Sequence, residues 1–380
     1  MGVWDEIQNG ESKKLEFKSA MIEHKKIAKT IVAFSNTSGG KFLVGVADNK
    51  SIVGVDPAIA QDVIDSITNI IDDICAPQIR PSIYMENVDG KIIIVVEVFP
   101  GAQKPYYIKN EGIPDGVYVR ISATSRKADK STIRDLERER ENIGFDEEIR
   151  YHHERNLVNE ERLSNDFSKY TGKHLSENDL INLKLLKSKE GDLLPTNGYI
   201  LFTDSGRYFE YVLIKCARFK GNDTSHFIDR KEIELPIYEQ IEASVKFAKM
   251  YIALGCDIVG TRRIDRYAIP MRAIREAIVN AVTHRDYSKD TSFIAMNIFD
   301  DRIEITSPGS LPGMLDVGQI KQGRSEIRNK VIARVLKEMG FIEQWGTGIN
   351  RIISESRTLG VKDPVFEEIG QSFRVTIYAI

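Results

Sequence analysis

The sequence predicts a mixed α/β protein made of two modules, and three observations lead to that prediction. The chain has 380 residues. Since a typical domain has about 150 residues, this length predicts more than one domain. Its 42% hydrophobic and 29% charged residues are typical of globular proteins. Runs with strand and helix periodicity lie on both sides of a charged stretch. We therefore predict domains at 1–128 and 195–380, joined by a charged helical connector at 129–194.

The first module has the pattern of a small mixed α/β unit. Ile64, Ile67, Ile71 and Ile74 recur at helical spacing, which predicts an amphipathic helix. The expected strands are 15–18, 41–47, 51–55, 91–98 and 116–120. One helix is expected between the first strand and about residue 35, and another at 57–74.

Charge marks the connector, and apolar periodicity marks the second module. Acidic and basic residues alternate from Arg134 to Glu141, which is typical of an exposed helix. After Pro195 the expected elements are strands at 199–202 and 212–219, helices at 233–254 and 273–283, and a hairpin of 293–298 with 302–306. This order predicts an α/β sandwich.

Cysteine usage and hydropathy exclude several classes of protein. Cys75, Cys216 and Cys256 are far apart and form no Cys-x-x-Cys pair, which argues against a disulfide framework or a structural zinc site. No apolar run approaches the roughly 18 residues that cross a bilayer, and the N-terminus lacks the pattern of a signal peptide. We therefore expect a cytoplasmic protein with no membrane partner.

Charge is distributed unevenly along the first module. The net charge of −3 gives no global attraction to nucleic acid, but basic residues gather in 13–50 and 104–130. If these segments fold together, they form the positive face that phosphate binding needs. A solvated surface of mixed charge is the alternative.

Short motifs in the first module carry a more specific signal. They are Glu11-Ser12-Lys13-Lys14-Leu15-Glu16-Phe17-Lys18, Ala33-Phe34-Ser35-Asn36-Thr37-Ser38-Gly39-Gly40, Gly45-Val46-Ala47-Asp48 and Tyr118-Val119-Arg120-Ile121. In order and spacing they resemble the Schlafen AlbA-2 domain. The resemblance implies binding of DNA or RNA, for which the candidate residues are Lys18, Asn36, Gly39, Gly40, Lys41, Arg120, Arg126 and Lys127.

The glycine pair at 39–40 suits two roles. Glycines permit a backbone turn closed to bulky residues and let peptide N–H groups approach a phosphate. The alternative is that Gly39 and Gly40 only end a helix and turn the chain.

Three carboxylates of the same module suggest a nuclease. Glu16 alternates onto the polar face of its strand, Glu11 precedes that strand, and Asp48 ends the next one. Converging carboxylates can hold Mg²⁺ or Mn²⁺ against a scissile phosphate. In Schlafen ribonucleases an acidic trio has this role, and the resemblance implies it for Glu11, Glu16 and Asp48. In the alternative, Glu16 pairs with Lys18 and Asp48 shapes a turn.

A polar stripe lies along the predicted helix of the second module. Glu276, Asn280 and His284 are four residues apart in a segment otherwise rich in Ala, Ile and Val. The i, i+4 spacing places them on one helix face.

The second module resembles a divergent branch, found beside AlbA-2 domains, of the superfamily of gyrase, heat-shock-90, histidine-kinase and MutL ATPases. The matching motifs are His284-Arg285-Asp286-Tyr287, Asp301-Arg302-Ile303-Glu304-Ile305 with Ser307-Pro308-Gly309, Arg328-Asn329, and Gly346-Thr347-Gly348-Ile349. The resemblance implies that Glu276 activates water, Asn280 holds magnesium, and Gly346 and Gly348 cradle the phosphates of ATP.

One turn departs from the superfamily pattern. An aspartate usually reads the adenine amino group, and here Ser307 stands in that turn before Gly309. A serine hydroxyl lacks the strength of a charge-assisted hydrogen bond. The serine therefore weakens the prediction of adenine recognition.

Together, these features predict a nucleic-acid-binding regulator or defence protein. The ATPase-like domain is expected to form homo-oligomers, as a dimer, or to sense nucleotide. Two alternatives stay open: a metal-dependent endoribonuclease that uses Glu11, Glu16 and Asp48, and an ATP-binding ATPase that uses Glu276 and Asn280.

Overall fold

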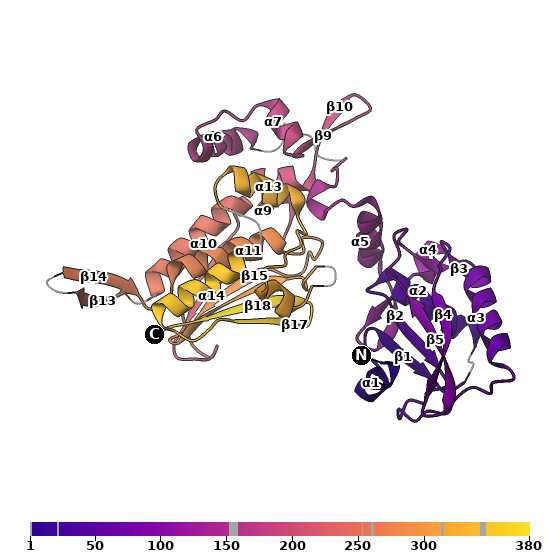
Figure 1. The fold of residues 1–380 in the computed structure, drawn as a ribbon. Coiled ribbons are helices and arrows are strands. Elements are labelled where there is room, and N and C mark those ends of the chain that lie inside the picture. The colour runs from indigo at the N-terminus through magenta and orange to yellow at the C-terminus, as the bar shows by residue number, and fades with distance from the viewer. Residues whose placement is uncertain are drawn as a thin grey trace. The chain divides into compact units, whose positions relative to one another are not determined.

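The computed structural model describes residues 2–20, 23–151, 159–252, 254–259, 262–312, 315–342 and 347–380. The chain divides into two compact units, Met1–Ile143 and Gly144–Ile380, and Figure 1 shows their helices and strands. The first unit extends beyond the predicted boundary at 128, because helix α5 (Lys130–Glu141) buries Leu136 against it. Residues 159–194 of the predicted connector belong to the second unit, whose core includes Leu163 and Leu180.

A four-stranded sheet forms the centre of the first unit. Its strands are β1 (Leu15–Lys18), β2 (Gly40–Val44), β5 (Lys91–Val98) and β4 (Ser82–Val88), in that order, with β1 parallel to β2 and the remaining pairs antiparallel. Alternate residues along a strand point to opposite faces. Helices α2 (His24–Asn36) and α3 (Ala60–Ile74) therefore cover Phe42, whereas α1 (Val3–Asn9) covers Leu43. The strand predicted at 51–55 is reduced to a bridge between Val46 and Ile52.

A second layer of short elements completes the first unit. It contains β3 (Cys75–Ala76), β6 (Tyr107–Ile108), α4 (Gly112–Gly116), β7 (Tyr118–Ile121) and β8 (Thr124–Lys127). Strands β7 and β8 form an antiparallel hairpin. Val119 of this hairpin packs with Leu136 of α5 in a small separate core.

The second unit begins with helices that pack on its main core. They are η1 (Phe145–Glu147), α6 (Glu160–Thr171), α7 (Glu177–Asn182), α8 (Asn197–Thr203) and α9 (Ser205–Tyr208), with the hairpin of β9 (Leu186–Lys189) and β10 (Asp192–Pro195) between them. The strand predicted at 199–202 is wrong, since this run lies in α8. The Thr196 side chain caps that helix by accepting from Tyr199 N, and its residues are buried all round. A short, wholly apolar run has no periodicity that separates helix from strand.

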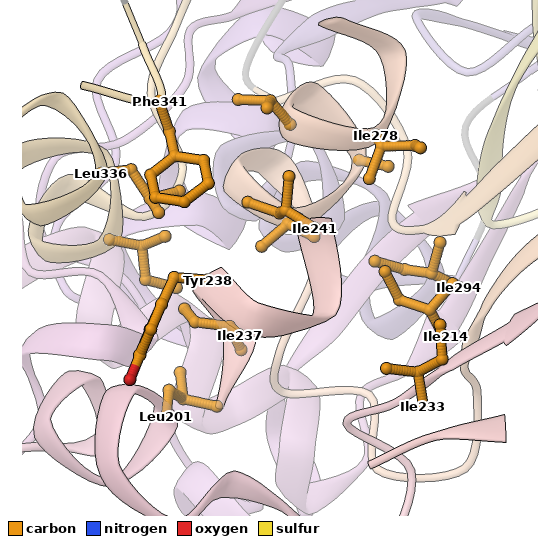
Figure 2. Close-up of a cluster of buried hydrophobic side chains, with 14 of the residues drawn as sticks. Leu201, Ile214, Ile233, Ile237, Tyr238, Ile241, Ile278, Ile294, Leu336 and Phe341 are labelled. Atoms are coloured by element: carbon orange, nitrogen blue, oxygen red, sulfur yellow. The ribbon is translucent and has the colours of Figure 1, made fainter. Parts of the chain in front are cut away.

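A six-stranded sheet supports the rest of the second unit. Its order is β12 (Phe227–Ile233), β11 (Ile214–Phe219), β15 (Ile294–Ile298), β16 (Arg302–Pro308), β18 (Ser372–Tyr378) and β17 (Val365–Ile369). The helices of this part are α10 (Ile237–Tyr251), α11 (Met271–His284), α12 (Val317–Lys321), α13 (Lys330–Glu338) and α14 (Gly348–Leu359). Ile214 and Ile294 of the sheet pack near Ile241 of α10 and Ile278 of α11 (Figure 2). A further hairpin of β13 (Leu254–Val259) and β14 (Arg262–Tyr267) extends from this unit (Figure 1).

The observed architecture is the mixed α/β class that the sequence predicted. In the part of the chain that the structure describes, no helix has the length and apolar character needed to span a membrane.

Candidate functional site

A cavity in the second unit collects the polar stripe of α11. Glu276, Asn280 and His284 line it together with Ser307 and Gly309 from the end of β16 and with Gly348 from the start of α14. The sheet contributes apolar lining through Ile305, Phe373 and Val375. The i, i+4 spacing in the sequence thus placed three side chains correctly at one site. Gly346 lies outside the described residues.

Gly348 allows α14 to begin directly against α11. A Cβ atom at this position would collide with Glu276 Oε1 and would lie 2.9 Å from Asn280 Nδ2. A contact under 3.0 Å requires a neighbour to move, so only glycine fits without displacing these two side chains. Arg351, one turn further along α14, donates from Nη1 to Glu276 Oε2 at 3.2 Å.

Two further lining residues differ in what they offer a ligand. Asn280 forms no side-chain hydrogen bond with another described residue, so its amide is open to the cavity. For His284, burial, with a smaller effect of the nearby Arg328 charge, lowers the imidazole pKa to about 4. His284 is therefore neutral near pH 7 and adds no positive charge to the cavity.

Ser307 has one hydrogen-bonding direction already occupied. Its hydroxyl donates to the carbonyl oxygen of Ala281 at 2.9 Å, and the residue is buried. A hydroxyl has one proton and two acceptor lone pairs. Ser307 can therefore only accept hydrogen bonds from a ligand in the cavity.

Side chains satisfy the carbonyl groups at the end of α11, a role that sequence reasoning missed. Orphan carbonyls at a helix C-terminus need partners when they are buried. Ser307 Oγ donates to the carbonyl oxygen of Ala281, and Tyr287 Oη donates to that of Val282. Asn329 Nδ2 donates to the carbonyl oxygens of Thr283 and Arg285, and Arg328 Nη1 donates to that of His284. All five distances are 2.7–2.9 Å. The motifs around Tyr287, Ser307 and Arg328–Asn329 thus hold α11 in place. No spacing in the sequence signals this role, because Ser307, Arg328 and Asn329 lie more than 20 residues beyond the end of α11.

The predicted acidic trio in the first unit is not assembled. Glu16 pairs with Lys18 at 2.7 Å and with the buried Arg120 at 2.8 Å. Glu11 accepts a hydrogen bond from Phe17 N at 2.8 Å, and Asp48 is exposed in a turn. Among the residues with described side chains, no three His, Cys, Asp or Glu groups form a metal-binding cluster. Both glutamates therefore have protein partners in this structure, and the Mg²⁺ or Mn²⁺ site of the three carboxylates stays a prediction.

The glycine pair at 39–40 is a packing device. A Cβ on Gly39 would lie 2.6 Å from Val98 O, and one on Gly40 would lie 2.5 Å from the Phe34 ring. Gly39 N donates to Phe34 O at 3.0 Å, as in a helix C-terminus. Gly39 and Gly40 thus form the helix end that was the alternative, and phosphate contact at this turn stays a prediction.

Asn36 is also structural. It is buried, and its amide bonds Tyr106 N, Tyr106 O and Tyr118 O at 2.7–2.9 Å. All of these bonds join α2 to the chain around β6 and to β7. No donor of this amide remains for nucleic acid.

The predicted basic residues differ in whether their charge is paired. Lys41 pairs with Glu6 at 2.8 Å and Lys127 with Asp115 at 2.5 Å. Arg126 is exposed and bonds only weakly, through Nε to Thr124 Oγ1 at 3.4 Å.

Two exposed lysines that were not selected lie beside this group. Lys13 and Lys14 are exposed, and their side chains form no ion pair with a described residue. Their turn is closed by a bridge between Ser12 and Leu15. Arg120 Nη2 donates to Ser12 O at 2.9 Å, which ties the turn to the β7–β8 hairpin.

Comparison with known families supports two domains. Residues 11–129 match the family model described as "Schlafen, AlbA_2". Residues 291–377 match the model described as "Putative ATP-dependent DNA helicase recG C-terminal". The chain therefore carries an AlbA_2 domain followed by a domain of this second family, and the predicted two-domain architecture is confirmed. The second match begins after α11 and therefore does not cover Glu276 and Asn280.

Two solved structures are similar to this chain, and the first shares its fold. The DIP2311 protein from Corynebacterium diphtheriae aligns with 97% of this chain and 75% of its own, with a TM-score of 0.53 and 21% identity. The N-terminal domain of a RecG-related protein from Nitrosomonas europaea aligns with 33% of this chain and 90% of its own, with 26% identity and a TM-score of 0.25. No curated protein matched the chain.

Proposed function

We propose that the chain is a nucleic-acid-binding protein, acting as a regulator or in defence, whose second unit binds an adenine nucleotide with magnesium. The family matches support a nucleic-acid-related protein with an ATPase-type domain. The cavity on α11 carries the proposal, because it joins an apolar wall to a small set of convergent polar groups. That combination is typical of a ligand site.

The lining of the cavity fits the parts of a nucleotide. Ile305 and Val375 offer an apolar surface to a base. Ser307 accepts hydrogen bonds only, which suits the amino group of adenine and not the carbonyl oxygen of guanine. Gly348 and Ile349 place the N-terminus of α14 at the cavity, where the helix dipole favours phosphate.

Asn280 is the residue placed to hold the metal. Magnesium is usually bound by one or two protein oxygens together with phosphate oxygens and water. The Asn280 amide lines the cavity and has no described protein partner. Bound magnesium would neutralise phosphate charge, and Glu276, which lines the same cavity on the same helix, is the proposed acceptor of a proton from water.

We expect the cavity to widen when nucleotide binds. Its volume is about 160 Å³, below the roughly 300 Å³ at which ligand sites usually begin. The loop at 322–328 contributes Arg324, Ser325 and Glu326 to the lining and contains the positive-φ residue Gly323. We therefore expect this loop to move on binding.

Calorimetry tests the nucleotide site. A non-hydrolysable ATP analogue with magnesium should bind more tightly than the GTP analogue, because Ser307 can accept from the C6 amino group of adenine but cannot donate to the C6 carbonyl oxygen of guanine. Asn280→Ala should weaken binding by roughly tenfold, the cost of one strong polar contact. Asn165→Ala is the matched control, since Asn165 is exposed on α6. Absence of heat from wild-type protein at high concentration would defeat the proposal.

For the first unit, we infer that nucleic acid binds across the Lys13–Lys14 turn and the β7–β8 hairpin with Arg126. This inference is supported by the exposure of these residues and by the Arg120 tether. Lys13→Glu with Lys14→Glu should abolish most binding and flatten its salt dependence, since phosphate contacts release counterions. The double variant Arg80→Glu, Lys91→Glu makes the same charge change beside β4, at the opposite edge of the sheet. Equal loss in both variants would show that only net charge matters.

A further inference from the structure

Three segments of the first unit meet at one end of its four-stranded sheet. Strands β1, β2 and β5 are neighbours in that order (Figure 1). Because β1 is parallel to β2 and β5 is antiparallel to it, the residues before β1 and β2 lie at the same end as the residues after β5. The Lys13–Lys14 turn precedes β1, Gly39 precedes β2, and Phe99 follows β5. This end of the sheet therefore brings two lysines and an aromatic residue together.

The backbone on both sides of this phenylalanine is fixed by contacts with the end of α2. A Cβ atom on Gly39 would lie 2.6 Å from Val98 O and 2.9 Å from Pro100 Cδ. Gly101 N donates to Ser35 O at 2.8 Å. Backbone atoms packed this closely have little room to move. The aromatic ring is thus carried on a rigid support, which lowers the entropy lost when a ligand binds to it.

The Phe99 side chain is 56% exposed. Leaving an aromatic ring in water forgoes the stabilisation that its burial would bring. Single exposed apolar residues are common on protein surfaces, so exposure alone assigns no role to the ring. The charge around it indicates what kind of ligand it suits.

The positive charge at this end of the sheet comes from lysines that have no ion pair within the described part of the chain. Lys13 and Lys14 are both exposed and are in this state. Lys41, whose backbone N–H donates to Lys14 O at 2.8 Å, pairs with Glu6 and lies opposite Glu97 in the register of β2 and β5. Lys41 therefore meets these carboxylates, and the two lysines of the turn are left for phosphate.

The spacing suits a short stretch of a polynucleotide. Strands β1 and β5 are separated by two strand spacings, about 10 Å. About three nucleotides cover that distance at a rise of about 3.4 Å each. A backbone held at the Lys13–Lys14 turn can therefore place a nearby base over the Phe99 ring.

We propose that Phe99 is a stacking platform for an unpaired base and that the first unit binds single-stranded nucleic acid, DNA or RNA, with its phosphates at Lys13 and Lys14. This inference rests on the nucleic-acid site proposed above and names its substrate class. Every base has a π face, so an exposed aromatic ring beside positive charge holds single strands without reading their sequence. Paired bases present only their edges in the grooves of a duplex, which leaves the ring without a partner.

Fluorescence anisotropy of the full chain tests the platform. The probes are labelled single-stranded DNA and RNA of mixed sequence and the duplexes of the same sequence. Wild type should bind single strands more tightly than duplexes. Phe99→Leu keeps an apolar side chain without the aromatic face, and should weaken single-strand binding by roughly 5- to 100-fold, the range for one stacked base. Its duplex binding should not change, which also shows that the variant is folded.

Three comparisons separate stacking from other effects. Phe99→Tyr restores an aromatic face and should recover most of the affinity. Val53→Ala is the matched control, because Val53 is 51% exposed and its N–H bonds Gly45 O, just beyond the opposite end of β2. Phe99→Leu should keep the salt dependence of wild type, since no phosphate contact is lost, whereas Lys13→Glu with Lys14→Glu should flatten it.

The outcomes distinguish this inference from the function on which it rests. If Phe99→Leu binds single strands as wild type does, or loses duplex binding equally, the platform is wrong while the nucleic-acid site stands. A changed oligomeric state of Phe99→Leu in sedimentation, with unaltered binding, would assign the ring to a contact between protein chains and overturn the inference. If the loss appears with RNA alone or DNA alone, the platform stands and its strand is identified. If wild type binds neither single strands nor duplexes, the proposed nucleic-acid site fails and this inference fails with it.

Discussion

At the scale of single residues, the candidate sites show which kinds of pattern reveal function. Helical spacing correctly placed Glu276, Asn280 and His284 in one cavity, because i, i+4 geometry is local. The acidic trio, by contrast, requires carboxylates from three separate segments of the chain to converge and to be free of other partners. Glu16 satisfied Lys18 and Arg120 instead, and Arg120 lies 104 residues away in the sequence. Motif residues alone do not show which of them already have a partner.

His284 provides a prediction about acid stability. Burial lowers its pKa from 6.5 to about 4, so the folded state favours the neutral imidazole. A lowered folded-state pKa contributes stability that is present above pH 6.5 and is lost as pH falls toward 4. Across that window the free energy of unfolding of the second unit should fall by at most about 3 kcal/mol on account of this residue. Urea unfolding at a series of pH values measures the change.

A matched pair of variants isolates the contribution of His284. His284→Asn should flatten the acid limb between pH 6.5 and 4. His226→Asn should keep it, because His226 is exposed and solvated in the folded state as well. An acid limb that is unchanged in His284→Asn would show that other groups cause it.

At the scale of elements, the C-terminal end of α11 is held by side chains of other segments. Side chains from the loop after the helix, from β16 and from the start of α13 donate to the carbonyls of residues 281–285. Asn329 alone satisfies two of them and is fully buried. Unsatisfied buried carbonyls are costly. These contacts therefore fix the rotation of α11 and the direction in which Glu276 and Asn280 point.

The elements also show what sequence periodicity can predict. The helices at 57–74, 233–254 and 273–283 and the hairpin at 293–306 were found because their apolar spacing is regular, although their ends moved by a few residues. The error at 199–202 arose in α8, where every residue is buried. The connector was misjudged for a related reason. Its charged composition was read as exposure, yet Leu163 and Phe167 recur at helical spacing and enter the core.

At the scale of the whole molecule, the two units have separate cores. The buried clusters of residues 3–136 contain none of the residues that form the large core of 163–377. Residues that share one hydrophobic core usually unfold together in a single cooperative transition. We therefore expect two unfolding transitions, each sensitive only to changes in its own unit.

One substitution in each unit tests this independence by scanning calorimetry. Phe42→Ala should lower the free energy of unfolding of the first unit only, by about 3–5 kcal/mol, because removing a fully buried phenylalanine side chain leaves a cavity. Asn329→Ala should lower only the other transition, by about 2–5 kcal/mol, because two carbonyls of α11 lose their donor. A nucleotide that binds in the cavity on α11 should raise the unfolding temperature of the second unit only, since a ligand stabilises the unit that binds it. If both variants lower both transitions together, the units unfold as one cooperative body and their separate cores do not act separately.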